Sequence, residues 1–193
     1  MSILLAAHGT RSQAGRDCVE DIRSALEHRL GEPVRLGWVD VCEPHVADLV
    51  RDDDLLLPAF LGLGHHVSVD VPEAAAHAER VTITPHLGSA LGQPLVEQAI
   101  VERVLEAGGP WPTTIIGWAG SSHATSREQA RATARRLAAR WESGVRVELA
   151  TPRQLPPLLE AARGCGERVG IASMLLAPGF YQTRLEESGA DAT

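Results

Sequence analysis

The chain opens with Ile3-Leu4-Leu5-Ala6-Ala7-His8-Gly9-Thr10, five apolar residues that are followed by a histidine, a glycine and a threonine. Five apolar residues without polar alternation are typical of a strand that is buried on both faces of a parallel sheet. Residues 15–30 follow with apolar side chains at helical spacing. This opening predicts a βα unit with His8 at the carboxyl end of its strand, and the same unit recurs along the chain.

Short apolar runs and amphipathic stretches continue to alternate after this first unit. In the first half we predict further strands at 34–41, 55–61 and 81–84, and further helices at 44–50, 71–80 and 95–107. In the second half we predict strands at 113–117, 145–149 and 169–176, and helices at 126–141 and 155–163. Alternating β and α elements favour parallel sheets with right-handed crossovers, so the predicted fold class is α/β.

The two halves resemble copies of one unit, joined at Gly108-Gly109-Pro110-Trp111-Pro112. Glycines and prolines recur in the same order in both, so we predict an internal duplication with lobes at 1–108 and 113–193. The second copy stops before a counterpart of the fourth strand and last helix, so we expect that lobe to be C-terminally incomplete. The copies differ in polar chemistry, because His8, Glu43 and His66 correspond to Ala119, Thr151 and Tyr181.

The composition excludes several classes of function. The 193 residues are 44% hydrophobic and 22% charged, as in an ordinary globular protein, and their formal net charge of −7 argues against nucleic acid or an anionic membrane as partner. The three cysteines include no C-x-x-C pair, which fits a reducing compartment. No apolar run resembles a leader or is long enough to span a bilayer, so we expect a cytoplasmic protein. All 18 basic residues are arginines, which excludes Walker A and Schiff-base lysines.

Polar side chains follow the first three predicted strands, at the point where each strand ends. His8 follows the first strand, Glu43 the second, and His65-His66 the third. Because the carboxyl ends of parallel strands share one edge of a sheet, we expect these groups to converge there. Two imidazoles and a carboxylate suit a divalent ion such as Fe, Co, Ni or Zn. The same groups can also act as bases near neutral pH.

Each of these residues also has an ordinary structural explanation. His8 could cap a turn or lie in solvent, Glu43 could favour the start of the helix at Pro44, and His65-His66 could be loop residues. Their positions in three consecutive βα units make a shared site the better explanation. A dinucleotide site is a poor alternative, because the pair Gly62-x-Gly64 lacks the third glycine of that fingerprint.

Several short motifs, in this order, resemble the sirohydrochlorin chelatase family, the class II tetrapyrrole chelatases. In the first half they are Ala7-His8-Gly9-Thr10-Arg11, Glu43-Pro44, Pro58-Ala59-Phe60-Leu61, Gly64-His65-His66-Val67 and Asp70-Val71-Pro72. In the second half, Gly120-Ser121-Ser122 and Leu175-Leu176-Ala177-Pro178-Gly179 are similar to the degenerate copy of that family. The resemblance covers nearly the whole chain and implies two flavodoxin-like lobes.

The resemblance implies a lyase-type enzyme that inserts Co²⁺ or Fe²⁺ into sirohydrochlorin, in cobalamin or sirohaem biosynthesis; Ni²⁺ fits the same ligands. It makes His8 and His66 catalytic and metal-contacting, with Glu43 assisting. We expect the residues that bind the tetrapyrrole to be Arg11, which suits substrate carboxylates, together with Thr10 and His65.

No cofactor is expected beyond the metal ion that is inserted. The expected partners are the tetrapyrrole and the divalent metal, bound by a monomer or a homodimer. Two alternatives stay open: a non-catalytic carrier of metal or tetrapyrrole with the same fold, and an enzyme of this fold that acts on an unrelated anionic substrate. An insertion assay with and without the protein separates catalysis from binding.

Overall fold

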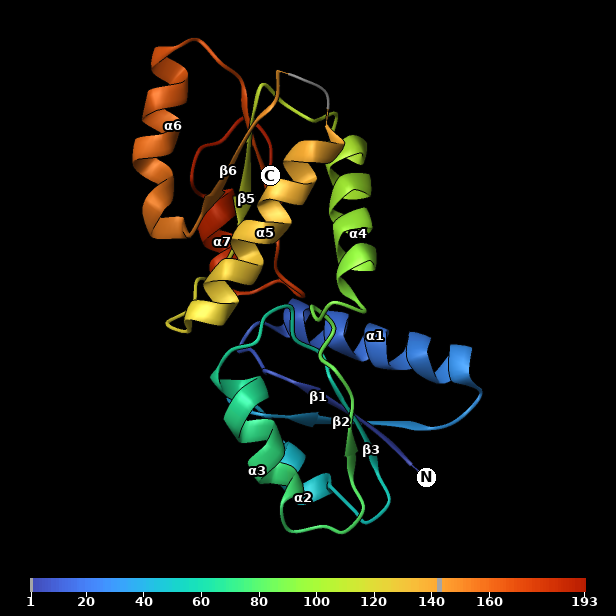
Figure 1. Ribbon diagram of the computed structural model, residues 1–193. Helices are drawn as coiled ribbons and strands as arrows, with labels where there is room; N and C mark the ends of the chain where they lie inside the picture. Colours follow the sequence, from blue (N-terminus) through green and yellow to red (C-terminus); the bar gives the residue numbers. More distant parts are fainter. Residues whose placement is uncertain (1, 142–143) are drawn as a thin grey trace. The chain divides into compact units, whose positions relative to one another are not determined.

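A computed structural model describes residues 2–141 and 144–193, which form two compact units (Figure 1). The first unit comprises Met1–Gly92 and Ala177–Gly179, and the second comprises Gln93–Leu176 and Phe180–Thr193. Each unit is built around its own parallel sheet. The predicted α/β class with two parallel sheets is therefore confirmed.

The first unit holds a four-stranded parallel sheet in the order β2-β1-β3-β4. Its strands are β1 (Ile3–Ala7), β2 (Val34–Trp38), β3 (Leu55–Pro58) and β4 (Thr82–Ile83). All five residues of β1 are buried, as the unbroken apolar run predicted. The first strand of the chain thus lies between the two that follow it, and loops leave the carboxyl ends of all three at one edge.

Helices cover both faces of this sheet. In Figure 1, α1 (Gln13–Leu30) lies on one face, and α2 (Val46–Leu49) and α3 (Val71–Ala75) lie on the other. Helix α1 begins two residues before its predicted start, because Ser12 caps it and accepts a hydrogen bond from the backbone N–H of Gly15. On the opposite face, Leu4 and Leu56 of the sheet pack in one apolar cluster with residues of α2 and α3.

The second unit holds a three-stranded parallel sheet in the order β6-β5-β7. The strands are β5 (Thr113–Gly117), β6 (Arg146–Ala150) and β7 (Val169–Ser173), and the helices are α4 (Gln93–Glu106), α5 (Ala124–Arg140), α6 (Leu155–Gly164) and α7 (Phe180–Glu186). Ile116 packs with α4 and α5, whereas Ile115 packs with α6 and α7. None of the described helices combines the length and apolar character that crossing a membrane requires.

Both sheets share one topology, with the first strand of each copy between the next two. No full fourth strand forms among the described residues of the second unit. Ala192 nevertheless makes a parallel bridge to Gly170 beside β7, the place that β4 takes beside β3. In the second unit the chain at Ala192 thus pairs with β7 on the side where β4 pairs with β3 in the first unit.

Packing divides the chain at a different place from the predicted joint between the copies. Helix α4 precedes that joint, yet its Ile100 and Val104 pack in one cluster with Trp111 and Leu137 of the second unit. The compact units therefore separate after Gly92, because α4 covers the second sheet. The copies at 1–108 and 113–193 stay a prediction about the sequence.

Several elements differ from their predicted extents. Strand β2 ends at Trp38 rather than 41, and Val41 has a left-handed φ of 68°, which an extended strand does not accommodate. A π-helical turn at His66–Asp70 precedes α3, in a stretch predicted as a loop. Helix α7 was not predicted, since its seven residues are too few for a periodic pattern.

We expect Gly170→Ala in β7 to lower the free energy of unfolding by about 1–3 kcal/mol. A Cβ atom at Gly170 would overlap the buried ring of Trp111, so one of the two must shift. Chemical denaturation followed by circular dichroism measures the change. Gly164→Ala is the matched control, because nothing lies within 4 Å of a Cβ there and alanine favours a helix. Equal stability of both variants would contradict the packing described for β7.

Candidate functional site

His8 lies directly after β1, with its side chain exposed. Its Nδ1 is 2.9 Å from the carbonyl oxygen of Gly9. A carbonyl oxygen can only accept a hydrogen bond, so Nδ1 carries a proton, and in the neutral tautomer with this proton Nε2 has the lone pair. Gly9 has a φ of +89°, and a Cβ atom there would overlap the carbonyl oxygen of Asp40, so the tight turn after β1 requires glycine.

His66 begins the π-helical turn that precedes α3. Its Nδ1 lies 2.5 Å from Oδ2 of Asp70, four residues further along the same turn. A carboxylate oxygen accepts hydrogen bonds, so Nδ1 of His66 is the donor, and in the neutral tautomer with this proton Nε2 has the lone pair. When one ring nitrogen of a histidine binds a metal, a hydrogen bond from the other ring nitrogen orients the imidazole and strengthens it as a ligand.

The structure brings His8 and His66 together. Their ring centroids are 4.5 Å apart, with the ring planes at 87°. Two imidazoles bound to one ion at about 2.1 Å, with a bond angle near 90–110°, have ring centres roughly 4.5–5.3 Å apart. The spacing of the pair therefore fits two nitrogen ligands of a single ion. The metal role of either histidine stays a prediction.

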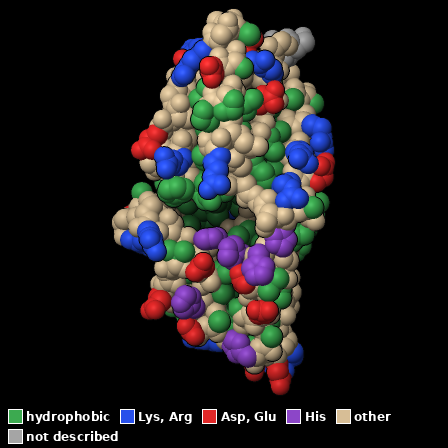
Figure 2. Space-filling view, turned by 90° about the vertical axis from the view of Figure 1, so that its left-hand side faces the viewer, with side chains coloured by type: hydrophobic (Ala, Val, Ile, Leu, Met, Phe, Trp, Pro, Cys, Tyr) green, Lys and Arg blue, Asp and Glu red, His purple; other side chains and the backbone are tan. Residues whose placement is uncertain are grey.

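Two further side chains surround this pair. The ring of Phe60 is stacked on His66 at a centroid distance of 6.1 Å. The ring centroid of His65 lies 6.4 Å from that of His66, and its Nε2 is 3.4 Å from Oδ1 of Asp70. Asp70 thus interacts with two histidines, of which His65 is the more exposed. Figure 2 shows several histidine side chains on one face of the first unit.

The predicted helper Glu43 lies on the loop after β2, at the same edge of the sheet. That loop is held against the first one, where the backbone N–H of Asp40 donates to the carbonyl oxygen of His8 at 3.1 Å. The Glu43 side chain is exposed, and it makes no hydrogen bond or ion pair in the part of the chain that the structure describes. Its role therefore stays a prediction.

The predicted substrate-binding residues Thr10 and Arg11 continue the turn from His8. The Oγ1 of Thr10 accepts a hydrogen bond from the backbone N–H of Ser12 at 3.2 Å, and its carbonyl oxygen accepts one from Cys42 at 3.2 Å. Thr10 therefore shapes the turn after β1. The Arg11 side chain is exposed, which suits a contact to a substrate in solution.

Among residues 2–141 and 144–193, no three His, Cys, Asp or Glu side chains are arranged to hold a metal ion together. Of the two imidazoles of the pair, that of His66 is hydrogen-bonded to Asp70, and that of His8 is hydrogen-bonded to the backbone of Gly9.

Asp70 is the residue that the sequence reasoning did not select. It entered that reasoning only as part of a family motif, although its spacing from His66 was a usable signal. Residues four apart on a helical turn lie side by side, and a His-x-x-x-Asp pair in that geometry orients the imidazole.

His86 is a buried histidine of the first unit, with 7% of its surface exposed. It lies on the loop after β4, where the backbone N–H of Leu87 donates to the carbonyl oxygen of Pro58. Its Nε2 has no hydrogen-bond partner among the described residues. Burial lowers the pKa of this imidazole, so the ring is neutral in the folded chain near pH 7.

The CbiX family profile matches residues 2–107, more than half of the chain. Among solved structures, the sirohydrochlorin chelatase SirB of Bacillus subtilis subspecies spizizenii, in complex with cobalt, is 18% identical with a TM-score of 0.76, covering 97% of this chain and 80% of that one. SirB of Bacillus subtilis with Fe³⁺ is 19% identical with a TM-score of 0.74, covering 97% and 81%.

A third solved structure is CbiX, the terminal enzyme of sirohaem biosynthesis in denitrifying bacteria. It is 20% identical with a TM-score of 0.67, covering all of this chain and 89% of that one. At such identities the likeness shows a shared fold. No curated protein matches the chain.

We expect Asp70→Asn to weaken the binding of Co²⁺ about 10- to 100-fold. The NH₂ group of the asparagine can turn toward Nδ1 of His66. The hydrogen bond from Nδ1 to the carboxylate, which leaves Nε2 as the nitrogen for the metal, is then lost. Calorimetric titration with Co²⁺ measures the affinity. Asp21→Asn, on an exposed position of α1, is the matched control. Unchanged affinity in Asp70→Asn would show that the carboxylate does not act through His66.

We expect the free energy of unfolding to decrease as the pH falls through the range below about 6.5. The pKa of His86 is lower in the folded than in the unfolded chain, so the unfolded chain takes up the proton first. In His86→Leu this part of the decrease should disappear. Urea titrations at pH 7.5 and 5.5 compare the two proteins, and an identical decrease in both would rule out His86 as its source.

Proposed function

The chain belongs to the CbiX family, and from this premise we propose that it is a sirohydrochlorin chelatase that inserts Co²⁺ or Fe²⁺ into the tetrapyrrole. The observation that carries the proposal is the pair formed by His8 and His66, with ring centroids 4.5 Å apart. SirB, which has a similar fold, is solved with cobalt and with iron. The product would serve cobalamin or sirohaem biosynthesis in the cytoplasm.

Insertion exchanges the water ligands of the ion for ring nitrogens and releases the two pyrrole protons. The two imidazoles suit these tasks, because each has its Nδ1 hydrogen-bonded to an oxygen and its Nε2 lone pair available. In our proposal one Nε2 binds the incoming ion, while the other takes the two pyrrole protons one after the other and gives up each of them to solvent. The metal is a substrate here, and no resident cofactor is needed.

The neighbouring side chains have supporting roles in this proposal. Asp70 holds His66 in the metal-binding tautomer and stabilises the imidazolium after proton uptake. Glu43, exposed at the same edge of the sheet, passes the proton to water. Arg11 pairs with a carboxylate of the tetrapyrrole, and Thr10 and His65 contact the ligand beside it.

A site with few protein ligands leaves coordination positions of the metal ion open, which suits the transfer of the ion to the tetrapyrrole. A resident structural metal is normally enclosed by four protein ligands, whereas a catalytic ion keeps at least one position for another molecule. With one imidazole as its protein ligand, the ion can bind the protein and ring nitrogens at the same time. Release then follows when the remaining pyrrole nitrogens replace that imidazole.

We expect His8→Ala and His66→Ala each to lower the rate of Co²⁺ insertion into sirohydrochlorin about 10²- to 10⁴-fold, because each removes a metal ligand or a base. The change in absorbance of the tetrapyrrole follows the reaction. His77→Ala is the matched control, with an exposed histidine of the first unit. Circular dichroism verifies that the variants fold.

Two results would contradict the proposal. If both single variants insert the metal as fast as the unmodified chain, the histidines do not carry the reaction. If the unmodified chain binds the tetrapyrrole or the metal but leaves the protein-free rate unchanged, it is the carrier that stands as the alternative.

A further inference from the structure

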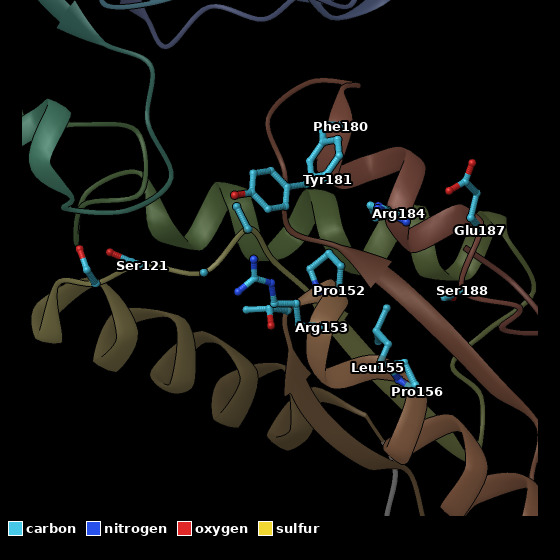
Figure 3. Close-up of a pocket in the computed structure, with 14 residues that line it drawn as sticks. Ser121, Pro152, Arg153, Leu155, Pro156, Phe180, Tyr181, Arg184, Glu187 and Ser188 are labelled. Atoms are coloured by element: carbon cyan, nitrogen blue, oxygen red, sulfur yellow. The ribbon is translucent and has the colours of Figure 1, made fainter.

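The second unit contains a cavity of about 900 Å³ at the carboxyl ends of its strands (Figure 3). Its lining comes from the loops after β5 and β6, from α7 and from the start of α6. The size is in the range of pockets that enclose most of a small organic molecule. Five of the lining side chains carry the argument: Arg153, Phe180, Tyr181, Arg184 and Glu187.

This cavity occupies the place in the second copy that the histidine pair occupies in the first. The residues that correspond to His8, Glu43 and His66 are Ala119, Thr151 and Tyr181, and all three line it. Its lining includes no histidine or cysteine, and Glu187 is its one carboxylate. The cavity thus has the position of the histidine pair without its imidazoles, and its lining does not favour a metal ion.

Two aromatic side chains of α7 remain uncovered in this cavity. Phe180 is 68% exposed and Tyr181 45% exposed, which is high for large side chains of a folded chain. Their rings are 5.5 Å apart at 79°. The guanidinium of Arg184 lies 5.4 Å from the centre of the Phe180 ring. Together these groups form a surface on which a flat ring system can stack.

The charge of the cavity favours an anion, although the whole chain is acidic. Arg153 and Arg184 come from different elements, and neither forms an ion pair within the described part of the second unit. In Figure 3 the guanidinium of Arg153 points toward the side of the cavity where Tyr181 lies. Two arginines against Glu187 give a net positive lining in a chain of net charge −7.

We propose that this cavity binds a planar aromatic molecule with carboxylates on its rim, independently of the histidine pair. The aromatic rings contact its face, and the guanidinium forks pair with carboxylates at separate points of its edge. Arginines on separate elements suit anions spread around a rim better than one compact polyphosphate. A tetrapyrrole has this chemistry; the identity of the natural ligand rests on the proposed function, whereas the existence of the site does not.

The test is a titration of the full chain with metal-free uroporphyrin, a flat macrocycle with carboxylates around its edge, followed by its visible absorbance. We expect saturable binding that weakens at least about tenfold in Arg153→Ala/Arg184→Ala and in Tyr181→Ala. Arg131→Ala/Arg135→Ala on α5 removes the same charge outside the cavity and should bind as the unmodified chain does. If the first double variant does not fold, Arg153→Lys/Arg184→Lys keeps the charge, loses the forks and should bind at least about threefold more weakly.

A second arm separates this proposal from the chelatase proposal. His8→Ala/His66→Ala should keep the saturable uroporphyrin binding that Arg153→Ala/Arg184→Ala loses, whatever its rate of metal insertion. The site is disproved if the arginine variants bind as tightly as the unmodified chain, or if affinity is lost in the histidine variant alone. Displacement of uroporphyrin by ATP at similar concentration would assign the cavity to phosphate ligands and overturn the proposed class.

Discussion

The burial of β1 between β2 and β3 is the constraint on which the first unit depends. All five side chains of this strand are buried, so the sheet continues on both sides of it and helices cover both faces. A parallel sheet then sends the loops after β1, β2 and β3 to one edge. His8 and His66 meet there because the strands pair in this order, although 57 intervening residues separate them in the chain.

Hydrogen bonds from the two Nδ1 atoms orient the rings of this pair. The Nδ1 of His8 donates to a backbone carbonyl and that of His66 to Asp70, so Nε2 is the ring nitrogen left for another partner in both. Each bond is local, within one residue or one helical turn. The tertiary fold supplies the 4.5 Å spacing, and local structure supplies the orientation.

The two units show how one sheet topology can carry different side chains. Both sheets place their first strand between the next two, so the carboxyl ends of three strands meet at one edge in each. Near that edge the first unit holds imidazoles and Asp70, and the second holds exposed aromatics and arginines. The sheets can accommodate this difference because these side chains lie beyond the ends of the strands and are not part of the buried core.

The sequence by itself determined the α/β class, the order of most elements and the membership of a chelatase family, which the CbiX match confirms. Those features depend on local periodicity and short motifs. Tertiary structure decided that α4 packs on the second sheet, that His86 is buried, and that Tyr181 and two arginines share a cavity. Burial and packing depend on side chains distant in the chain, and no local pattern specifies which of them meet.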